Sequence, residues 1–215
     1  ADPSVAPSLP VDTAASTGLN VDNTSSFLGL LTQTQGLTAK QSEDLIKSTQ
    51  ALAKANNVAP DKVLGDIANS TETFAKFADK GGKNILRAAI QARKLGTNLE
   101  AVAGAAEGFL DFQTSLNAEV EASILLGRDV NLQKARELAL AGDLEGVQTQ
   151  IVNQLGSAEE FSKLNVLQRK SLASAVGLEL SQVEKIVNKQ KEQVTLAGEL
   201  SKQSTENLVS EKTIT

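Results

Sequence analysis

The sequence contains no cysteine, histidine, methionine, tryptophan or tyrosine, and its 215 residues include only six phenylalanines. Without histidine and cysteine the chain has no Ser–His or Cys–His nucleophile pair, no zinc finger, no His or Cys haem ligand and no disulfide bond. The formal net charge of −5 argues against nucleic acid as a partner, because backbone binding needs a basic face. We therefore predict a non-enzymatic protein with no catalytic residues, cofactor or metal site.

Long apolar runs and strand-like patterns are also lacking. No stretch approaches the ~20 consecutive apolar residues of a membrane-spanning helix, so no transmembrane segment is predicted. Alternating Val, Ile, Thr and aromatic residues are missing, whereas Ala, Leu, Glu, Lys and Gln dominate. The composition predicts an all-α fold, a multi-helix bundle of short capped helices with a longer C-terminal helical arm.

The distribution of residue types predicts three parts. Residues 1–26 hold three of the four prolines and many Ser and Thr, and are expected to be flexible because they offer little to bury. The helical bundle is predicted over 27–180, and residues 181–215 form a C-terminal helix that is a candidate coiled-coil arm. The chain begins at Ala1 without Met, so we expect a processed chain or a fragment of a longer protein.

Polar caps and glycine stops mark the predicted helix boundaries. A capping box is a cap residue followed three positions later by Glu or Gln, and boxes are predicted at Thr97/Glu100, Ser157/Glu160, Asn165/Gln168 and Ser181/Glu184. Single caps are predicted at Asn131 and Asp143, a left-handed stop at Asn57 and a helix start at Pro60. Residues 98–126 fit either one long helix or two helices that break near Gly108.

Aliphatic side chains must fill the core, because aromatic residues are so few. Within 98–126 an apolar stripe at helical spacing is predicted to face the core, formed by Phe109, Phe112, Leu116, Val120 and Ile124. The full set of side chains predicted to be largely buried is Phe109, Leu116, Ile124, Leu138, Ile151, Leu155 and Leu172.

Two local patterns invite a chemical interpretation. The densest carboxylates are Glu100, Glu107, Asp111, Glu119 and Glu121. A pair of them could cleave a glycan, but that chemistry needs a cleft and a stacking aromatic, so a solvated helix face is the preferred interpretation. The glycine-rich segment 79–84 precedes a helix and could hold a phosphate, but it lacks the Gly-Lys-Ser/Thr ending of a Walker loop and is interpreted as a plain helix break.

The last helix carries a thin apolar seam that becomes polar toward its end. The seam predicted for self-association consists of Val183, Val187, Gln190, Val194 and Ala197. Such a stripe suits a helix that leaves the body and pairs loosely with copies of itself, which predicts a homo-oligomer. A terminal helix that frays at its end is the alternative, and both interpretations stay open.

Two runs of sequence carry a family resemblance. The run AEVEASILLGRDVNLQKARELALAGDLEGV (118–147), followed by QIVNQLGSAEEFSKLNVLQRKSLASAVGLELSQVEKIV (150–187), resembles tape measure proteins of tailed bacteriophages, those of contractile-tailed marine phages in particular. The likeness covers roughly 85–190. It implies a helical module of a chain that fills the tail tube, sets tail length and is expelled before the DNA.

The resemblance also implies partners and a location. Tail tube and baseplate hub proteins would be the partners, and the virion tail lumen the location, after assembly in the host cytoplasm. Peptidoglycan-cleaving domains of some tape measure proteins usually depend on His, Cys or Tyr, which are absent here, so that activity is not carried over. The alternative function is a helical adaptor or effector domain that binds a protein partner in a groove between helices.

Overall fold

The predicted all-α fold is confirmed by a computed structural model that describes residues 9–212, except for the side chains of Leu9, Lys80 and residues 197–212. The structure is 81% helical, with thirteen α-helices and no strand among the described residues. The helices are α1 (Leu9–Thr17), α2 (Val21–Gln35), α3 (Ala39–Ala55), α4 (Pro60–Asn69), α5 (Thr71–Phe77), α6 (Lys83–Lys94), α7 (Leu99–Leu110), α8 (Phe112–Leu126), α9 (Gln133–Leu140), α10 (Leu144–Leu155), α11 (Ala158–Lys163), α12 (Val166–Ala175) and α13 (Leu180–Lys212). A 3-10 turn, η1 (Lys80–Gly82), joins α5 to α6.

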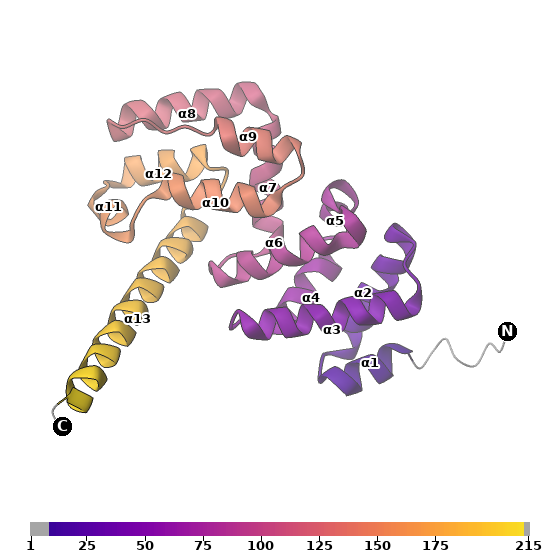
Figure 1. The fold of residues 1–215 in the computed structure, drawn as a ribbon. Coiled ribbons are helices and arrows are strands. Elements are labelled where there is room, and N and C mark those ends of the chain that lie inside the picture. The colour runs from indigo at the N-terminus through magenta and orange to yellow at the C-terminus, as the bar shows by residue number, and fades with distance from the viewer. Residues whose placement is uncertain (1–8, 213–215) are drawn as a thin grey trace.

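The helices form two neighbouring groups and a projecting arm (Figure 1). In the first group α2 packs against α1, α3 and α4, and in the second α8 packs against α12 while α10 packs against α9. Helix α6 joins the groups, because it contacts α3 and α4 on one side and α7 and α10 on the other. Helix α13 starts beside α10, α11 and α12 and then leaves the body.

One continuous hydrophobic core runs through both groups. Because six phenylalanines are the only aromatics, aliphatic side chains supply most of its volume, as the composition predicts. The largest fully buried side chains include Phe27, Ile46 and Ile67 in the first group, and Phe109 and Leu155 in the second. Phe27 belongs to the apolar cluster at 27–31, which here lies inside α2.

The prediction of a flexible segment over 1–26 is wrong for residues 9–26, which form α1 and the start of α2; residues 1–8 lie outside the described part. Asn20 caps α2 by accepting hydrogen bonds from the backbone N–H groups of Asp22 and Asn23. The Thr24 hydroxyl is buried because it donates to the carbonyl of Asn20 at 2.8 Å within its own helix. The hydroxyls of Ser16 and Thr17 likewise donate to backbone carbonyls of their own helix, whereas the buried Thr13 hydroxyl has no hydrogen-bond partner among the described residues.

Most of the predicted caps are confirmed. Capping boxes are present at Ser157/Glu160 and Asn165/Gln168, Asp143 accepts from the Gly146 N–H, and Asn57 is left-handed with φ 56°. Helix α4 begins at Pro60, as predicted. At α9 the cap position is Leu132, one residue beyond the predicted Asn131, whose side chain still accepts the Gln133 N–H at 3.1 Å.

Two predicted boxes are displaced by one or two residues. The cap of α7 is Asn98, whose side chain accepts from the Ala101 N–H at 2.9 Å, and Thr97 is buried instead. Helix α13 begins at Leu180, so Ser181 already lies inside it, and Gln182 accepts from the Glu179 N–H. In both cases several polar residues stand side by side in the sequence, and only the tertiary path of the chain selects one of them.

Residues 98–126 form two helices, not one. The break falls at Asp111, three residues beyond the predicted Gly108, where φ −80° and ψ 84° interrupt the helical path. Asp111 caps α8 by accepting hydrogen bonds from the N–H and the hydroxyl of Thr114. The turn gives α8 an orientation of its own, independent of α7.

The predicted core residues divide into three classes. Phe109, Ile151, Leu155 and Leu172 are buried as predicted, and Leu138 is half-buried. The prediction is wrong for Leu116 and Ile124, which are exposed on α8. The stripe expected to face the core thus turns outward after Phe109.

Replacing Asn98 with alanine should lower the free energy of unfolding by about 0.5–2 kcal/mol, because the Ala101 N–H loses its acceptor. Ser181→Ala is the matched control and should change stability little, since Ser181 is exposed inside α13. Chemical denaturation followed by circular dichroism measures both. Equal effects of the two substitutions would contradict the cap assignment.

A second pair of variants tests the orientation of α8. Ile151→Ala should cost about 2–5 kcal/mol of unfolding free energy, because Ile151 is buried and a cavity remains. Ile124→Ala removes the same atoms from an exposed site and should change stability by no more than about 0.5 kcal/mol. Thermal and denaturant unfolding give both values, and a large loss at Ile124 would place that side chain in the core.

Candidate interaction surfaces

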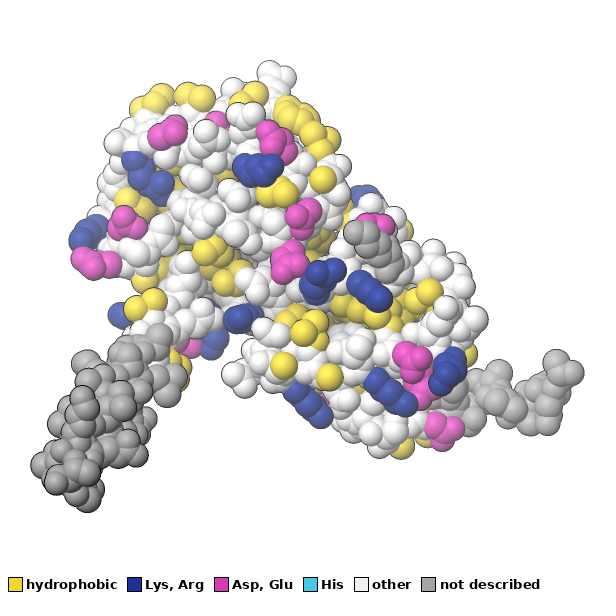
Figure 2. Space-filling model, viewed as in Figure 1, with side chains coloured by type: hydrophobic (Ala, Val, Ile, Leu, Met, Phe, Trp, Pro, Cys, Tyr) yellow, Lys and Arg dark blue, Asp and Glu magenta, His cyan; other side chains and the backbone are white. Residues whose placement is uncertain are grey.

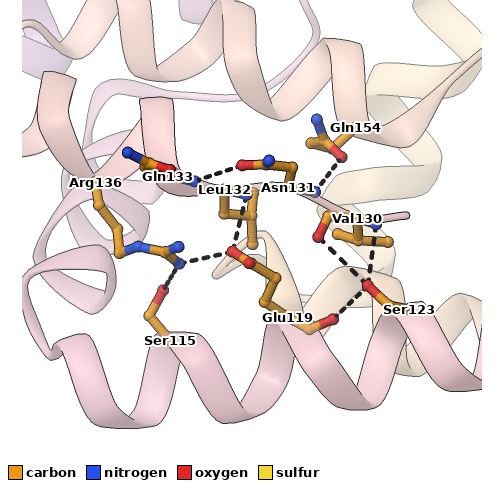
Figure 3. A network of polar contacts seen from close by, with 9 residues as sticks. All are labelled: Ser115, Glu119, Ser123, Val130, Asn131, Leu132, Gln133, Arg136 and Gln154. Atoms are coloured by element: carbon orange, nitrogen blue, oxygen red, sulfur yellow. Dashed lines mark hydrogen bonds and ion pairs between the residues drawn. The ribbon is translucent and has the colours of Figure 1, made fainter. Parts of the chain in front are cut away.

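The inner face of α8 carries polar side chains beside the packed Ala118, Ala122 and Leu126, and a buried ion pair links it to α9 (Figure 3). The Nη1 atom of Arg136 in α9 lies 2.8 Å from Glu119 Oε2 and donates to Ser115 Oγ at 3.1 Å. The same carboxylate oxygen accepts the Leu132 N–H at 2.8 Å. Arg136 is only 5% exposed, so each charge is compensated inside the protein.

The loop between α8 and α9 is bonded to the same face. Ser123 Oγ accepts the Val130 N–H at 3.0 Å, and Gln154 Oε1 of α10 accepts the Asn131 N–H at 3.1 Å (Figure 3). Glu119 was predicted to be part of a solvated face, and this is wrong, because its carboxylate points inward toward Arg136. Arg136 was not predicted as a site residue. The signal that could have found it is its spacing from Leu132 and Ala139, because a charged residue on an otherwise apolar helix face is a candidate for a buried charge.

This inner network leaves an apolar row on the outer side of α8. Phe112 is 46%, Leu116 45%, Val120 56% and Ile124 73% exposed, whereas Ser115 and Ala122 on the opposite side are buried. We call Phe112, Leu116, Val120 and Ile124 the α8 row. Figure 2 shows hydrophobic side chains along the edge of the molecule that α8 forms in Figure 1. The predicted core stripe is thus a surface feature, and a continuous row of exposed apolar side chains is a candidate interaction surface.

A second apolar feature lies beside the end of the α8 row. Val166 and Leu167 at the start of α12 are 66% and 60% exposed. The next residue, Gln168, donates from its Nε2 to the Leu125 carbonyl at 3.0 Å, so the start of α12 touches the last turn of α8.

The self-association seam predicted on α13 is only partly at the surface. Val183 and Val187 are buried against the body of the same chain, together with Ile186, so these positions do not form a free seam. The close packing depends on Gly177, where an added Cβ would lie 3.0 Å from the Ala105 Cα. The first turns of α13 are therefore anchored to the body of the chain. Apolar side chains three or four residues apart suit packing within one chain as well as pairing between chains.

Farther along α13 the seam reaches solvent beside a groove. Gln190 is half-buried, Val194 is 73% exposed, and the side chain of Ala197 lies outside the described residues. Between α11 and α13 a groove of about 680 Å³ is lined by Ser157, Ala158, Glu159, Ser162, Gln190, Lys191, Val194 and Thr195. Its apolar and amide groups can receive a protein segment.

Other carboxylates, among them Glu107, Asp111 and Glu160, take part in caps and surface pairs. Glu107 lies 3.0 Å from Lys76, which also pairs with Glu72. The pKa of Asp111 lies below its ordinary value because the Thr114 hydroxyl and N–H donate to it. The pKa of Glu160 is lowered by the N–H and hydroxyl of Ser157, so both caps are charged near neutral pH.

The glycine-rich segment at 79–84 is a helix break with its own internal bonds. Asn84 accepts from the Asp79 N–H at 2.9 Å and donates to the Phe77 carbonyl at 2.6 Å. Gly82 has φ 82°, and a Cβ there would lie 2.4 Å from the Phe74 ring. Gly82 is therefore required by its packing against Phe74, which agrees with the interpretation of residues 79–84 as a helix break.

The described residues offer neither a cluster of metal ligands nor a membrane-spanning helix. No group of three or more Asp and Glu side chains is placed to hold a metal ion within residues that the structure describes. In the same part of the chain, no helix has both the length and the apolar character needed to cross a bilayer.

Comparisons with known proteins leave the family open. Neither a protein family model, nor a curated protein sequence, nor a solved structure matches this chain. The function therefore has to be argued from the surfaces and from the sequence resemblance.

A double-mutant cycle should measure the coupling between Arg136 and Glu119. Arg136→Met alone leaves a carboxylate with little solvent and should cost about 3–5 kcal/mol of unfolding free energy. Adding Glu119→Gln removes that charge and keeps an acceptor for the Leu132 N–H, so the double variant should be more stable than Arg136→Met. Additive losses in denaturant unfolding would show that the pair is not coupled.

Proposed function

We propose that this protein is a non-enzymatic structural module of a phage tail tape measure protein. The sequence run that resembles that family, 118–187, corresponds to most of α8 and all elements up to the anchored start of α13. The resemblance therefore covers one contiguous group of packed helices and the root of the arm. In this role the module works by association with other helical chains, in the tail lumen, after assembly in the host cytoplasm.

The observation that carries the proposal is the arm itself. Helix α13 has 33 residues and would extend about 50 Å at the ordinary helical rise. Its first turns are fixed by Val183, Ile186 and Val187, and the remainder leaves the body (Figure 1). A long helix anchored at one end supports a role as a rigid connection between this module and neighbouring helical partners, among them tail tube and baseplate hub proteins.

The structural contacts of three of the five dense carboxylates also support a non-enzymatic role. Glu119 is neutralised by Arg136, Glu107 pairs with Lys76, and Asp111 caps α8. A carboxylate pair for glycan cleavage needs one acid and one base that face a common cleft. These three side chains are instead committed to three separate contacts.

The groove between α11 and α13 favours a second candidate function. A groove of about 680 Å³ is of the size that receives a side-chain cluster or a short helix of a partner. In that case the chain would be an adaptor or effector domain, and the exposed Val194 would contact the partner.

An in-frame duplication of residues 180–212 in the parent gene tests the tail role. If α13 runs along the tail axis, 33 extra helical residues should lengthen the tail by up to about 50 Å. Electron microscopy of purified particles measures the length, and mass spectrometry confirms that the extended chain is present. A strain with silent codon changes over the same residues is the control.

The outcome separates the two candidate functions. Unchanged tail length in particles that contain the extended chain would contradict the tape measure role. Absence of the chain from particles, together with loss of a bound protein upon Val194→Glu, would favour the adaptor role.

A further inference from the structure

The α8 row has a symmetric spacing. Its four members, Phe112, Leu116, Val120 and Ile124, recur every four residues, and the midpoint of the row falls at Ala118. An antiparallel copy of α8 related by a two-fold axis at this midpoint would set Phe112 opposite Ile124, and Leu116 opposite Val120. The row is therefore complementary to itself, which is the requirement for an isologous interface between two identical chains.

The geometry of the row also suits helix pairing. Side chains four residues apart form one ridge of a helix, and helices pack by placing the ridges of one into the grooves of the other. No other described element of the chain covers this ridge, because all four side chains are about half exposed or more. Figure 1 places α8 at the end of the molecule opposite to the far end of α13.

The helix dipoles favour the antiparallel orientation. A parallel pair of α8 helices would align the two dipoles, whereas an antiparallel pair opposes them, which lowers the electrostatic energy.

The area of the row predicts the strength of the contact. Four partly exposed apolar side chains offer a few hundred Å² on each copy, and Val166 and Leu167 extend the patch at one end. Stable interfaces bury about 1,200–2,000 Å² in total, so two copies meeting at this row fall near or below the lower limit. The size corresponds to a weak, reversible dimer.

We propose that the α8 row is a self-association surface at which two copies of this chain pair through antiparallel α8 helices. The proposal moves the predicted homo-oligomer contact from α13 to α8. It goes beyond the tail role and stands whether or not that role holds, because it depends only on this chain.

Sedimentation of the full chain over a range of concentrations tests the proposal. The unaltered chain should show a monomer–dimer equilibrium, and Val120→Glu with Ile124→Glu should raise its Kd by about tenfold or more, because charges would be buried against an apolar ridge. Both side chains are already in solvent, so the fold should persist, which circular dichroism checks. Leu52→Glu on α3 is the matched control and should leave the Kd unchanged.

A variant on α13 distinguishes a dimer formed through α8 from one formed through α13. Val194→Glu alters the exposed part of α13 and should not affect the dimer. A strict monomer at every concentration would overturn the proposal. So would a dimer that Val194→Glu abolishes and the α8 substitutions leave intact.

Cross-linking tests the orientation, because the chain has no native cysteine. In the proposed pair, a cysteine at Asn117 lies close to the two-fold axis, offset from its own copy by about 3 Å along the helix axis. A cysteine at Gln113 is offset from its own copy by about 15 Å along the helix axis. A short bismaleimide should therefore link Asn117→Cys chains far more efficiently than Gln113→Cys chains. Equal efficiency at both positions would indicate a parallel pair and overturn the antiparallel arrangement.

Discussion

The buried contact between Arg136 and Glu119 sets the orientation on which the outer surface depends. An ion pair taken out of water is tolerated only when its remaining donors and acceptors are satisfied, and here Ser115 and the Leu132 N–H complete the set. Because Glu119 and Ser115 must point toward α9, the apolar side chains on the other side of α8 must point outward. The contact thus converts a stripe that resembles a core face into an exposed ridge.

Helix α13 likewise has a part that is buried against the body and a part whose apolar side chain is exposed to solvent. At the root of α13, Val183 and Val187 are buried by the chain's own helices, and close approach at Gly177 brings the turn before α13 onto α7. Beyond Gln190 the body ends, so Val194 remains exposed beside the groove. The regularly spaced apolar residues of α13 therefore have two roles. Val183 and Val187 anchor the helix to the body, and Val194 forms part of the surface.

Local signals in the sequence predicted local structure well. The boxes at Ser157 and Asn165, the cap at Asp143 and the helix start at Pro60 involve atoms within three or four residues of one another, so no distant element has to be known. The helical segment 9–26 was missed for a different reason. It has no strong apolar pattern, and Thr13, Ala14 and Thr24 are buried where α1 and α2 pack against each other and against α3.

The sequence by itself determined the all-α class, most helix ends and an aliphatic core, since these follow from propensity, capping and composition. Only the tertiary structure decided which face of α8 is buried, because periodicity marks an apolar face without saying whether protein or solvent covers it. One of the distant partners, Arg136, lies 17 residues from Glu119 and becomes its neighbour only in the folded chain, in which α8 also packs against α12. An interaction between two helices cannot be derived from the pattern of either helix alone.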